Sequence, residues 1–170
     1  MGSRISMKYF FLILVFSLCC IASGSAQTAK DTAVDYQFSL KNFDGVRYDW
    51  KSLVDSNKTV IVSFWASYCL PCLKELDELN VLGASYSAKG VQIVTINIDM
   101  RQDMMKARRI VLQKKLKLPV LSDETGNVRK QYRVNAIPRL FIFSQGGVLK
   151  YEHQGFKEIK DIEQEVLSLI

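Results

Sequence analysis

The most informative stretch of the chain is TVIVSFWASYCLPC, residues 59–72. Its first part, Thr59–Ala66, is almost entirely β-branched or aromatic, which favours a central strand buried on both faces of a sheet. Leucines then recur at helical spacing after the second cysteine, at positions 73, 76, 79 and 82. Cys69 and Cys72 are therefore predicted to lie where a buried strand passes into a helix.

Strand and helix patterns alternate on both sides of this stretch. Before it we expect two short strands around a turn and a short helix, at Tyr36–Leu40, Val46–Tyr48 and Trp50–Val54. After it we expect further strands at Val91–Ile98, Val120–Ser122, Leu140–Phe143 and Val148–Glu152, and helices at Met104–Leu116, Glu124–Tyr132 and Glu158–Leu169. The last two strands flank Gly146–Gly147 as a hairpin. The alternation predicts an α/β fold, with a central mixed sheet flanked by helices and an extra N-terminal strand pair.

The first 26 residues have the layout of a secretory signal peptide. Arg4 and Lys8 precede an apolar run of 14 residues, Tyr9–Ala22, and the small residues after it place cleavage before Gln27. The run is short for a transmembrane helix, which needs ~20 residues. A membrane anchor that is retained remains the alternative.

Export predicts three parts: a signal peptide (1–26), a flexible leader (27–35) and one exported domain (36–170), which the resemblance described below implies is periplasmic. Cys19 and Cys20 lie in the apolar run, where we interpret them as ordinary apolar residues; lipidation of one of them is the alternative. Cleavage leaves only Cys69 and Cys72. The chain has 170 residues, is 48% hydrophobic and 24% charged, and has a net charge of +6. That composition is typical of a globular protein and does not indicate nucleic-acid binding.

The spacing of the cysteine pair suits reversible bond formation. Residues three apart in a helix lie ~5–6 Å from each other, within the ~4.4–6.8 Å Cα separation of a disulfide. A cysteine at the helix N-terminus is favoured as a thiolate, and Pro71 is tolerated in the first turn. Structural zinc needs four ligands, whereas the cleaved chain offers two cysteines and His153. We therefore expect redox exchange rather than a metal site, with a purely structural disulfide as the alternative.

The sequence resembles the thioredoxin superfamily over about residues 36–170. The residues that carry the resemblance are Phe64-Trp65-Ala66-Ser67-Tyr68-Cys69-Leu70-Pro71-Cys72, the later Ile137-Pro138 and the order of elements. The leader, the early strand pair and the block Asn97–Leu118 are similar to the TlpA/ResA-like periplasmic branch. The resemblance implies a thioredoxin-like fold and a monomeric thiol-disulfide oxidoreductase without cofactor. It also implies disulfide-containing protein substrates, apocytochrome c among them, and a membrane thiol as electron donor.

The resemblance also implies roles for individual residues. Cys69 matches the nucleophilic cysteine that forms a mixed disulfide with substrate, and Cys72 matches the cysteine that resolves it. Pro138 matches a cis-proline that presents the backbone of Ile137 to substrate, with an ordinary strand-start proline as the alternative. Trp65 matches the active-site tryptophan and a role in substrate binding, with core packing as the alternative.

Three positions call for separate interpretation. Ser63 stands where thioredoxin carries a buried aspartate. Glu75 stands where ResA-like proteins carry a functional glutamate, and at i+3 it shares a helix face with Cys72, so it is predicted to exchange that thiol's proton. The alternative for Glu75 is an acid favoured by the helix dipole. Arg139 stands where thioredoxins usually have a threonine after the proline. A cation there would stabilise a thiolate or select acidic partners; the alternative is a solvated arginine without such a role.

The residues between the cysteines predict the direction of electron flow. Leu70-Pro71 supplies no histidine to stabilise a Cys69 thiolate, so we expect a thiol pKa nearer ~7 than the ~3.5 of strong oxidants. That pKa is typical of a reductase. A copper chaperone and a peroxidase relative remain the alternatives on this fold, although the longer cysteine spacing of the first and the threonine-supported cysteine of the second are missing.

Overall fold

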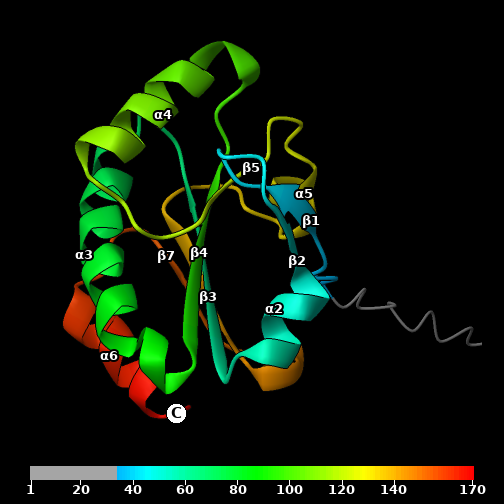
Figure 1. Cartoon of the computed structure of the whole chain (residues 1–170), viewed down its shortest axis with the longest axis vertical. Coiled ribbons are helices and arrows are strands. Elements are labelled where there is room, and N and C mark those ends of the chain that lie inside the picture. The colour runs from blue at the N-terminus through cyan, green and yellow to red at the C-terminus, as the bar shows by residue number, and fades with distance from the viewer. Residues whose placement is uncertain (1–33) are drawn as a thin grey trace, which may run out of the picture. The chain divides into compact units, whose positions relative to one another are not determined.

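A computed structural model describes residues 34–170, so the predicted signal peptide and almost all of the leader lie outside the described residues. Five strands form one mixed sheet in the order β5-β4-β3-β6-β7 (Figure 1). β3 (Thr59–Trp65) runs through its centre, parallel to β4 (Val91–Asn97) and antiparallel to β6 (Arg139–Ser144). β5 (Val120–Ser122) and β7 (Val148–Gln154) form the edges. Every residue of β3 is buried, as its sequence predicts.

Helices cover both faces of this sheet (Figure 1). α3 (Leu70–Tyr86) and α6 (Ile159–Leu167) pack on one face, where their side chains enclose Ile61 of β3. α2 (Trp50–Ser56) and α5 (Asn127–Gln131) lie on the other face. Successive residues of β3 serve opposite faces because strand side chains alternate. Full burial of a Val, Ile or Phe side chain contributes about 1.5–3 kcal/mol to folding stability. The strand therefore stabilises the packing of helices on both faces of the sheet.

α4 (Met104–Gln113) lies near the carboxyl ends of β3 and β4 and the start of α3 (Figure 1). Its buried residues Met104 and Ala107 pack in the same cluster as Trp65. This arrangement places α4 beside the segment that carries the cysteines. Within residues 34–170, no helix is long and apolar enough to cross a membrane.

The predicted N-terminal strand pair is present but shorter than its sequence pattern. β1 (Ser39–Lys41) pairs with β2 (Arg47–Asp49) in an antiparallel hairpin. β1 begins only at Ser39 because its partner β2 ends at Asp49, where α2 begins; the Phe38 carbonyl still accepts a hydrogen bond of 2.9 Å from the N–H of Trp50. The rings of Tyr36 and Phe38 pack against Tyr132, at centroid distances of 5.0 and 6.3 Å, so both residues still contribute to the core.

Two helices also differ from their predicted limits. α4 ends at Gln113 rather than Leu116, and Lys115 adopts a positive φ of 49°, which a continuing helix cannot contain. α5 begins at Asn127 rather than Glu124, because Asp123 accepts hydrogen bonds from the backbone N–H groups of Val128 and Arg129 and fixes the turn before the helix.

Candidate active site

Cys69 and Cys72 form a disulfide where β3 passes into α3, with a Cα separation of 5.2 Å. Cys69 is the N-cap residue of α3, and its sulfur accepts a hydrogen bond from the backbone N–H of Cys72 at 3.3 Å. The side chain of Cys69 is 7% exposed and that of Cys72 is 1% exposed. Cys69 is therefore the more accessible of the two cysteines.

The surface around Cys69 is apolar and open. Its neighbours Tyr68 and Leu70 are 71% and 76% exposed, although both are large hydrophobic residues. Pro71 lies in the first turn of α3, where a missing N–H costs nothing because no acceptor is available there. These exposed side chains frame Cys69.

Beneath the disulfide, Trp65 is fully buried and packs with both cysteines. Its indole Nε1 has no hydrogen-bond partner among the described residues. This placement corresponds to the packing interpretation of Trp65, since none of its surface is open to a substrate in this conformation. The ring supports the segment that carries Cys69.

Glu75 lies one helical turn after Cys72, on the buried side of α3, and is only 1% exposed. Its Oε1 accepts a hydrogen bond of 2.7 Å from the Ser63 hydroxyl on β3, while its Oε2 is buried without a partner among residues 34–170. Burial raises the pKa of Glu75 to about 7; the hydrogen bond from Ser63 opposes this shift, and the charge of Glu78 adds to it. A carboxyl with this pKa can gain or lose a proton near neutral pH.

The Ile137–Pro138 peptide bond is cis. Pro138 is buried, and its carbonyl accepts a hydrogen bond of 2.8 Å from the N–H of Gly155. Ile137 is half-buried and packs against the cluster that contains both cysteines. The structure thus brings this residue, far away in sequence, beside the disulfide.

Arg139 begins β6 and has partners of its own. Its guanidinium forms an ion pair of 2.7 Å with Glu152 on β7 and lies over the ring of Phe141, 5.0 Å from the centroid. The arginine is therefore neither fully solvated nor an uncompensated cation. Its charge is largely balanced by Glu152.

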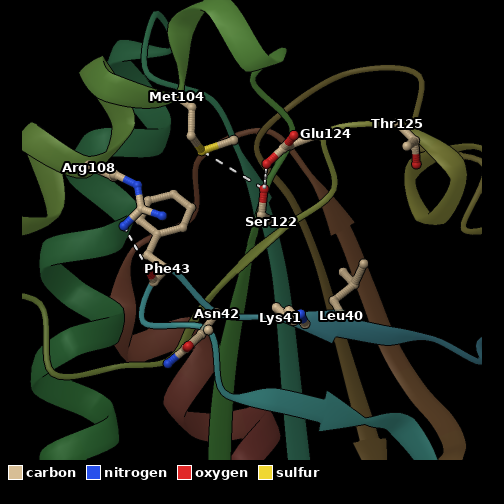
Figure 2. A pocket seen from close by; sticks show the side chains of 10 residues that line it. Leu40, Lys41, Asn42, Phe43, Met104, Arg108, Ser122, Glu124 and Thr125 are labelled. Atoms are coloured by element: carbon tan, nitrogen blue, oxygen red, sulfur yellow. Dashed lines mark hydrogen bonds between the residues drawn. The ribbon is translucent and has the colours of Figure 1, made fainter.

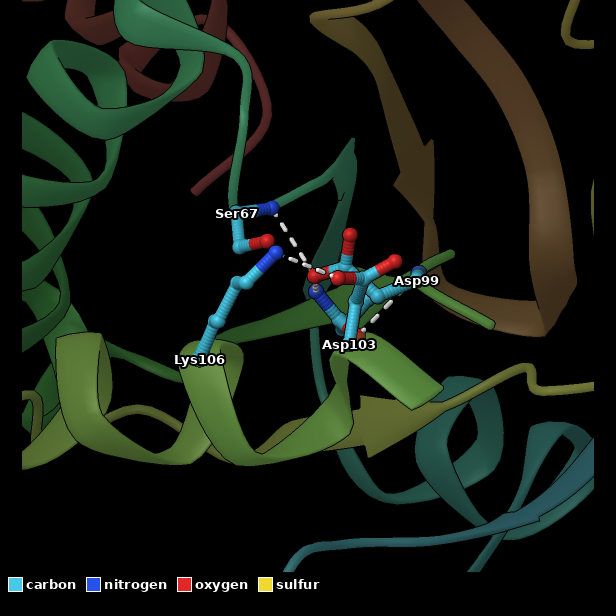
Figure 3. Close-up of polar contacts among 5 residues, drawn as sticks. Ser67, Asp99, Asp103 and Lys106 are labelled. Atoms are coloured by element: carbon cyan, nitrogen blue, oxygen red, sulfur yellow. Dashed lines mark hydrogen bonds and ion pairs between the residues drawn. The ribbon is translucent and has the colours of Figure 1, made fainter. Parts of the chain in front are cut away.

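The sequence interpretation missed Asp99, which anchors the loop between β3 and the cysteines (Figure 3). Asp99 is 2% exposed, and its Oδ2 accepts hydrogen bonds from the backbone N–H of Ser67 (2.8 Å) and from the Asn97 side chain (2.9 Å). The backbone N–H of Ile98 also donates to the carbonyl of Trp65. The available signal was Asn97-Ile98-Asp99 at the end of a buried strand, because parallel strands bring their carboxyl ends to one edge.

A pocket of about 420 Å³ is lined by Met104 and Arg108 of α4 together with residues of the hairpin and of the β5 segment (Figure 2). Arg108 of α4 donates a hydrogen bond to the carbonyl of Phe43 in the hairpin, and the Ser122 hydroxyl lies 3.9 Å from the Met104 sulfur. Among the described residues, no group of three or more His, Cys, Asp or Glu side chains is placed to hold a metal ion.

Comparisons with known proteins agree with this architecture. The profile of the AhpC/TSA family matches residues 29–152. The chain is 29% identical to a thiol-disulfide oxidoreductase, ResA, of Bacillus thuringiensis subsp. konkukian, over 92% of this chain and 94% of that protein. It is 27% identical to the sporulation thiol-disulfide oxidoreductase A of Bacillus subtilis, over 81% and 83%.

Among solved structures, the chain is similar to a Chlorobium tepidum protein described as a thiol:disulfide interchange protein DsbE. The TM-score is 0.72 and the identity 28%, over 78% of this chain and 92% of that one. The fold of the described residues is accordingly thioredoxin-like, with the N-terminal strand pair added to the five-stranded sheet.

Proposed function

Because the chain belongs to the AhpC/TSA family and is a thiol-disulfide oxidoreductase, we propose that it reduces disulfide bonds in other proteins outside the cytoplasm. The observation that carries this proposal is the Cys69–Cys72 disulfide at the N-terminus of α3, in which Cys69 is 7% exposed and Cys72 is almost fully enclosed. Such a pair forms a transient bond to a partner through the more exposed cysteine and breaks it through the enclosed one.

In the reduced chain, the Cys69 thiolate attacks one sulfur of the substrate disulfide, and the first substrate thiolate leaves. The N-terminus of α3 stabilises the Cys69 thiolate through the helix dipole and through the N–H of Cys72. The Cys72 thiolate then attacks the Cys69 sulfur, and the second substrate thiol leaves. Two electrons and two protons pass to the substrate, and the Cys69–Cys72 disulfide forms.

Glu75 is the proposed acceptor of the Cys72 proton. Cys72 is buried, so its thiol has little direct access to water. Glu75 lies one turn along the same buried side of α3, has an unpartnered Oε2, and has a pKa of about 7. Near neutral pH it is partly ionised and can take up the proton that must leave before Cys72 attacks.

The substrate is proposed to lie across Tyr68, Leu70 and the cis Ile137–Pro138 segment. These residues supply exposed apolar surface beside Cys69 and a backbone segment next to it. An extended peptide would pair with the backbone of Ile137 and so present its disulfide to Cys69. Trp65 supports this site from below rather than by direct contact.

The signal-peptide pattern of residues 1–26 supports export to the periplasm. A reductase there needs electrons from elsewhere, and we propose a membrane thiol protein as the donor and apocytochrome c among the substrates. Retention of the N-terminal segment as an anchor would keep the chain close to such a donor.

Alkylation of Cys69 tests the direction of electron flow. In the full chain with Cys72→Ser, the rate of iodoacetamide alkylation should rise with pH around a midpoint of ~7, as in reducing members of this chemistry. A midpoint of ~4 would indicate an oxidant instead. Insulin reduction should be lost in Cys69→Ser, and its retention would indicate a structural disulfide. Consumption of hydrogen peroxide at comparable rates would favour a peroxidase.

A further inference from the structure

The positive charge of the chain is concentrated in one segment. Residues 101–117 contain seven Lys or Arg side chains and a single acidic one, Asp103, which gives a net charge of +6. The net charge of the whole chain is also +6, so the remaining residues carry equal numbers of basic and acidic side chains. The segment consists of a short 3-10 turn, α4 and the loop that follows. One helix and its flanks thus account for the charge asymmetry of the protein.

Local acids neutralise only part of this charge. Three of the seven cations form ion pairs with carboxylates, namely Arg101 with Glu124, Lys106 with Asp103 and Lys114 with Asp77. Arg108 donates to an uncharged backbone carbonyl. Within residues 34–170, no ion pair involves the exposed side chains of Arg109, Lys115 or Lys117. Four cations therefore lack an acidic partner.

Exposed apolar side chains accompany these cations on the outer face of α4. Met105 and Leu112 are 70% and 77% exposed, and they share one side of the helix with Arg108 and Arg109 because of their spacing. The opposite side of α4 is buried through Met104 and Ala107, in the cluster that contains Cys69 and Cys72. The inner face of α4 thus packs in the cluster that contains the disulfide, while its outer face is exposed.

We propose that this outer face, defined as Met105, Arg108, Arg109 and Leu112 and extended by Lys115 and Lys117, docks an acidic protein whose disulfide the chain reduces. The inference rests on the proposed reductase function and names its substrate class. Arginine and methionine are enriched at protein interfaces. A patch of one charge sign raises the association rate of an oppositely charged partner by ~10–10³-fold.

An acidic protein explains the position of the face better than an anionic membrane does. Because α4 lies near the start of α3, a protein docked on α4 can extend past the helix and present its own disulfide to Cys69, whereas a lipid headgroup at the same place has no part in the exchange. In each turnover the partner's S–S bond breaks, the Cys69–Cys72 bond forms, and two electrons and two protons pass to the partner's thiols.

The test uses the reduced full chain and two synthetic peptides of equal length, each cyclised by one disulfide and flanked by glutamates or by lysines. The second-order rate constant of peptide reduction is measured at low salt and at ~1 M salt, where the Debye length falls to ~3 Å. The test variant is Arg109→Glu with Lys115→Glu. The control variant, Lys150→Glu with Lys160→Glu on β7 and α6, makes the same change in net charge elsewhere. Hydroxyethyl disulfide, a small neutral substrate, checks that every variant is folded and active.

The glutamate peptide should react at least about tenfold faster than the lysine peptide at low salt, and high salt should remove the difference. The test variant should lose or reverse the preference, while the control variant keeps most of it. Equal rates for the two peptides in the unmodified chain would overturn the docking surface while leaving the reductase function intact. A preference that survives in the test variant would overturn it as well.

Two further outcomes are also decisive. Absence of reaction with either peptide would contradict the reductase function itself and the docking surface with it. Salt-sensitive binding to phosphatidylglycerol vesicles that the test variant alone loses, together with equal peptide rates, would assign the face to a membrane and overturn the protein partner.

Discussion

The Ser63 hydroxyl donates a hydrogen bond of 2.7 Å to Glu75 Oε1, which links the central strand β3 to α3 just below the disulfide. Ser63 occupies the position where thioredoxin has a buried aspartate. The buried acid here lies on the helix instead, and the hydrogen bond from the strand residue Ser63 lowers the pKa of Glu75 against the effect of burial. The first two predictions follow from this contact.

Glu75 should make the stability of the oxidised chain fall as pH rises. Its folded pKa is about 7 and its ordinary value is 4.5, so between these values the folded state binds more protons than the unfolded state. Its contribution is fully present below pH 4.5, decreases between 4.5 and about 7, and is constant above that range. The loss amounts to about 3 kcal/mol at most.

Urea unfolding at pH 5 and pH 8 gives the change in the free energy of unfolding between these two pH values. The change is measured for the oxidised unmodified chain and for the oxidised Glu75→Gln variant, and the two are compared. The glutamine variant should lack most of the pH-dependent difference, because it cannot ionise. An identical decline in both proteins would place the titrating group elsewhere.

Ser63→Ala should destabilise the chain by about 1–3 kcal/mol, because it leaves a buried carboxyl oxygen without its partner. It should also raise the pKa of Glu75 further, since the hydrogen bond from Ser63 opposes the effect of burial. Thr59→Val is a matched control on the same strand, because the Thr59 hydroxyl is buried and has no partner among the described residues. The control should be neutral or stabilising; a cost equal to that of Ser63→Ala would show that the Glu75 contact contributes little.

Asp99→Ala should loosen the loop that carries Cys69. The variant removes the acceptor of the Ser67 N–H, a hydrogen bond to a carboxylate worth about 1.5–3 kcal/mol. Amide hydrogen exchange at Ser67 should accelerate by about ten- to a hundredfold. Asp99→Asn keeps an acceptor oxygen and should accelerate exchange much less. Equal exchange in both variants and the unmodified chain would mean that other contacts fix the loop.

Arg139→Ala should leave the alkylation midpoint of Cys69 nearly unchanged, because Glu152 already balances the charge of the arginine. The partly exposed pair should contribute at most about 1 kcal/mol to stability. Glu152→Gln is the matching variant: it leaves the cation uncompensated and should lower the alkylation midpoint if Arg139 lies close enough to Cys69. A large rise of the midpoint in Arg139→Ala would instead assign the arginine a direct role in stabilising the thiolate.

Sequence patterns predicted the fold where hydrophobic periodicity was strong. β3 is a continuous run of buried residues, β4 is buried except at the partly exposed Gln92, and the leucines after Cys72 mark the buried side of α3, so both kinds of element could be placed. Element ends were less predictable because they depend on tertiary contacts. β1 is short because its partner strand gives way to α2 at Trp50, a boundary that the alternation of Tyr36, Phe38 and Leu40 does not reveal.

The same limit applied to the candidate site. Cys69, Cys72 and Glu75 follow one another at intervals of three residues at the start of α3. Their proximity therefore follows from local helical spacing. The contact of Ser67 with Asp99 joins the segments that follow β3 and β4, and the contact of Arg139 with Glu152 joins β6 and β7. The end of β4 marks Asp99 as a candidate, but local spacing does not specify which residue each of these side chains contacts. The burial of Trp65 also depends on α4, which follows it by about forty residues.

The central claim is that Cys69 attacks a substrate disulfide and Cys72 releases the product. Trapping in the full chain with Cys72→Ala tests it most directly, with insulin as the disulfide probe and mass spectrometry to locate the bond. The account predicts a stable mixed disulfide on Cys69 that disappears in the Cys69→Ala, Cys72→Ala double variant. Absence of the adduct in Cys72→Ala, or its persistence in the double variant, would contradict the account.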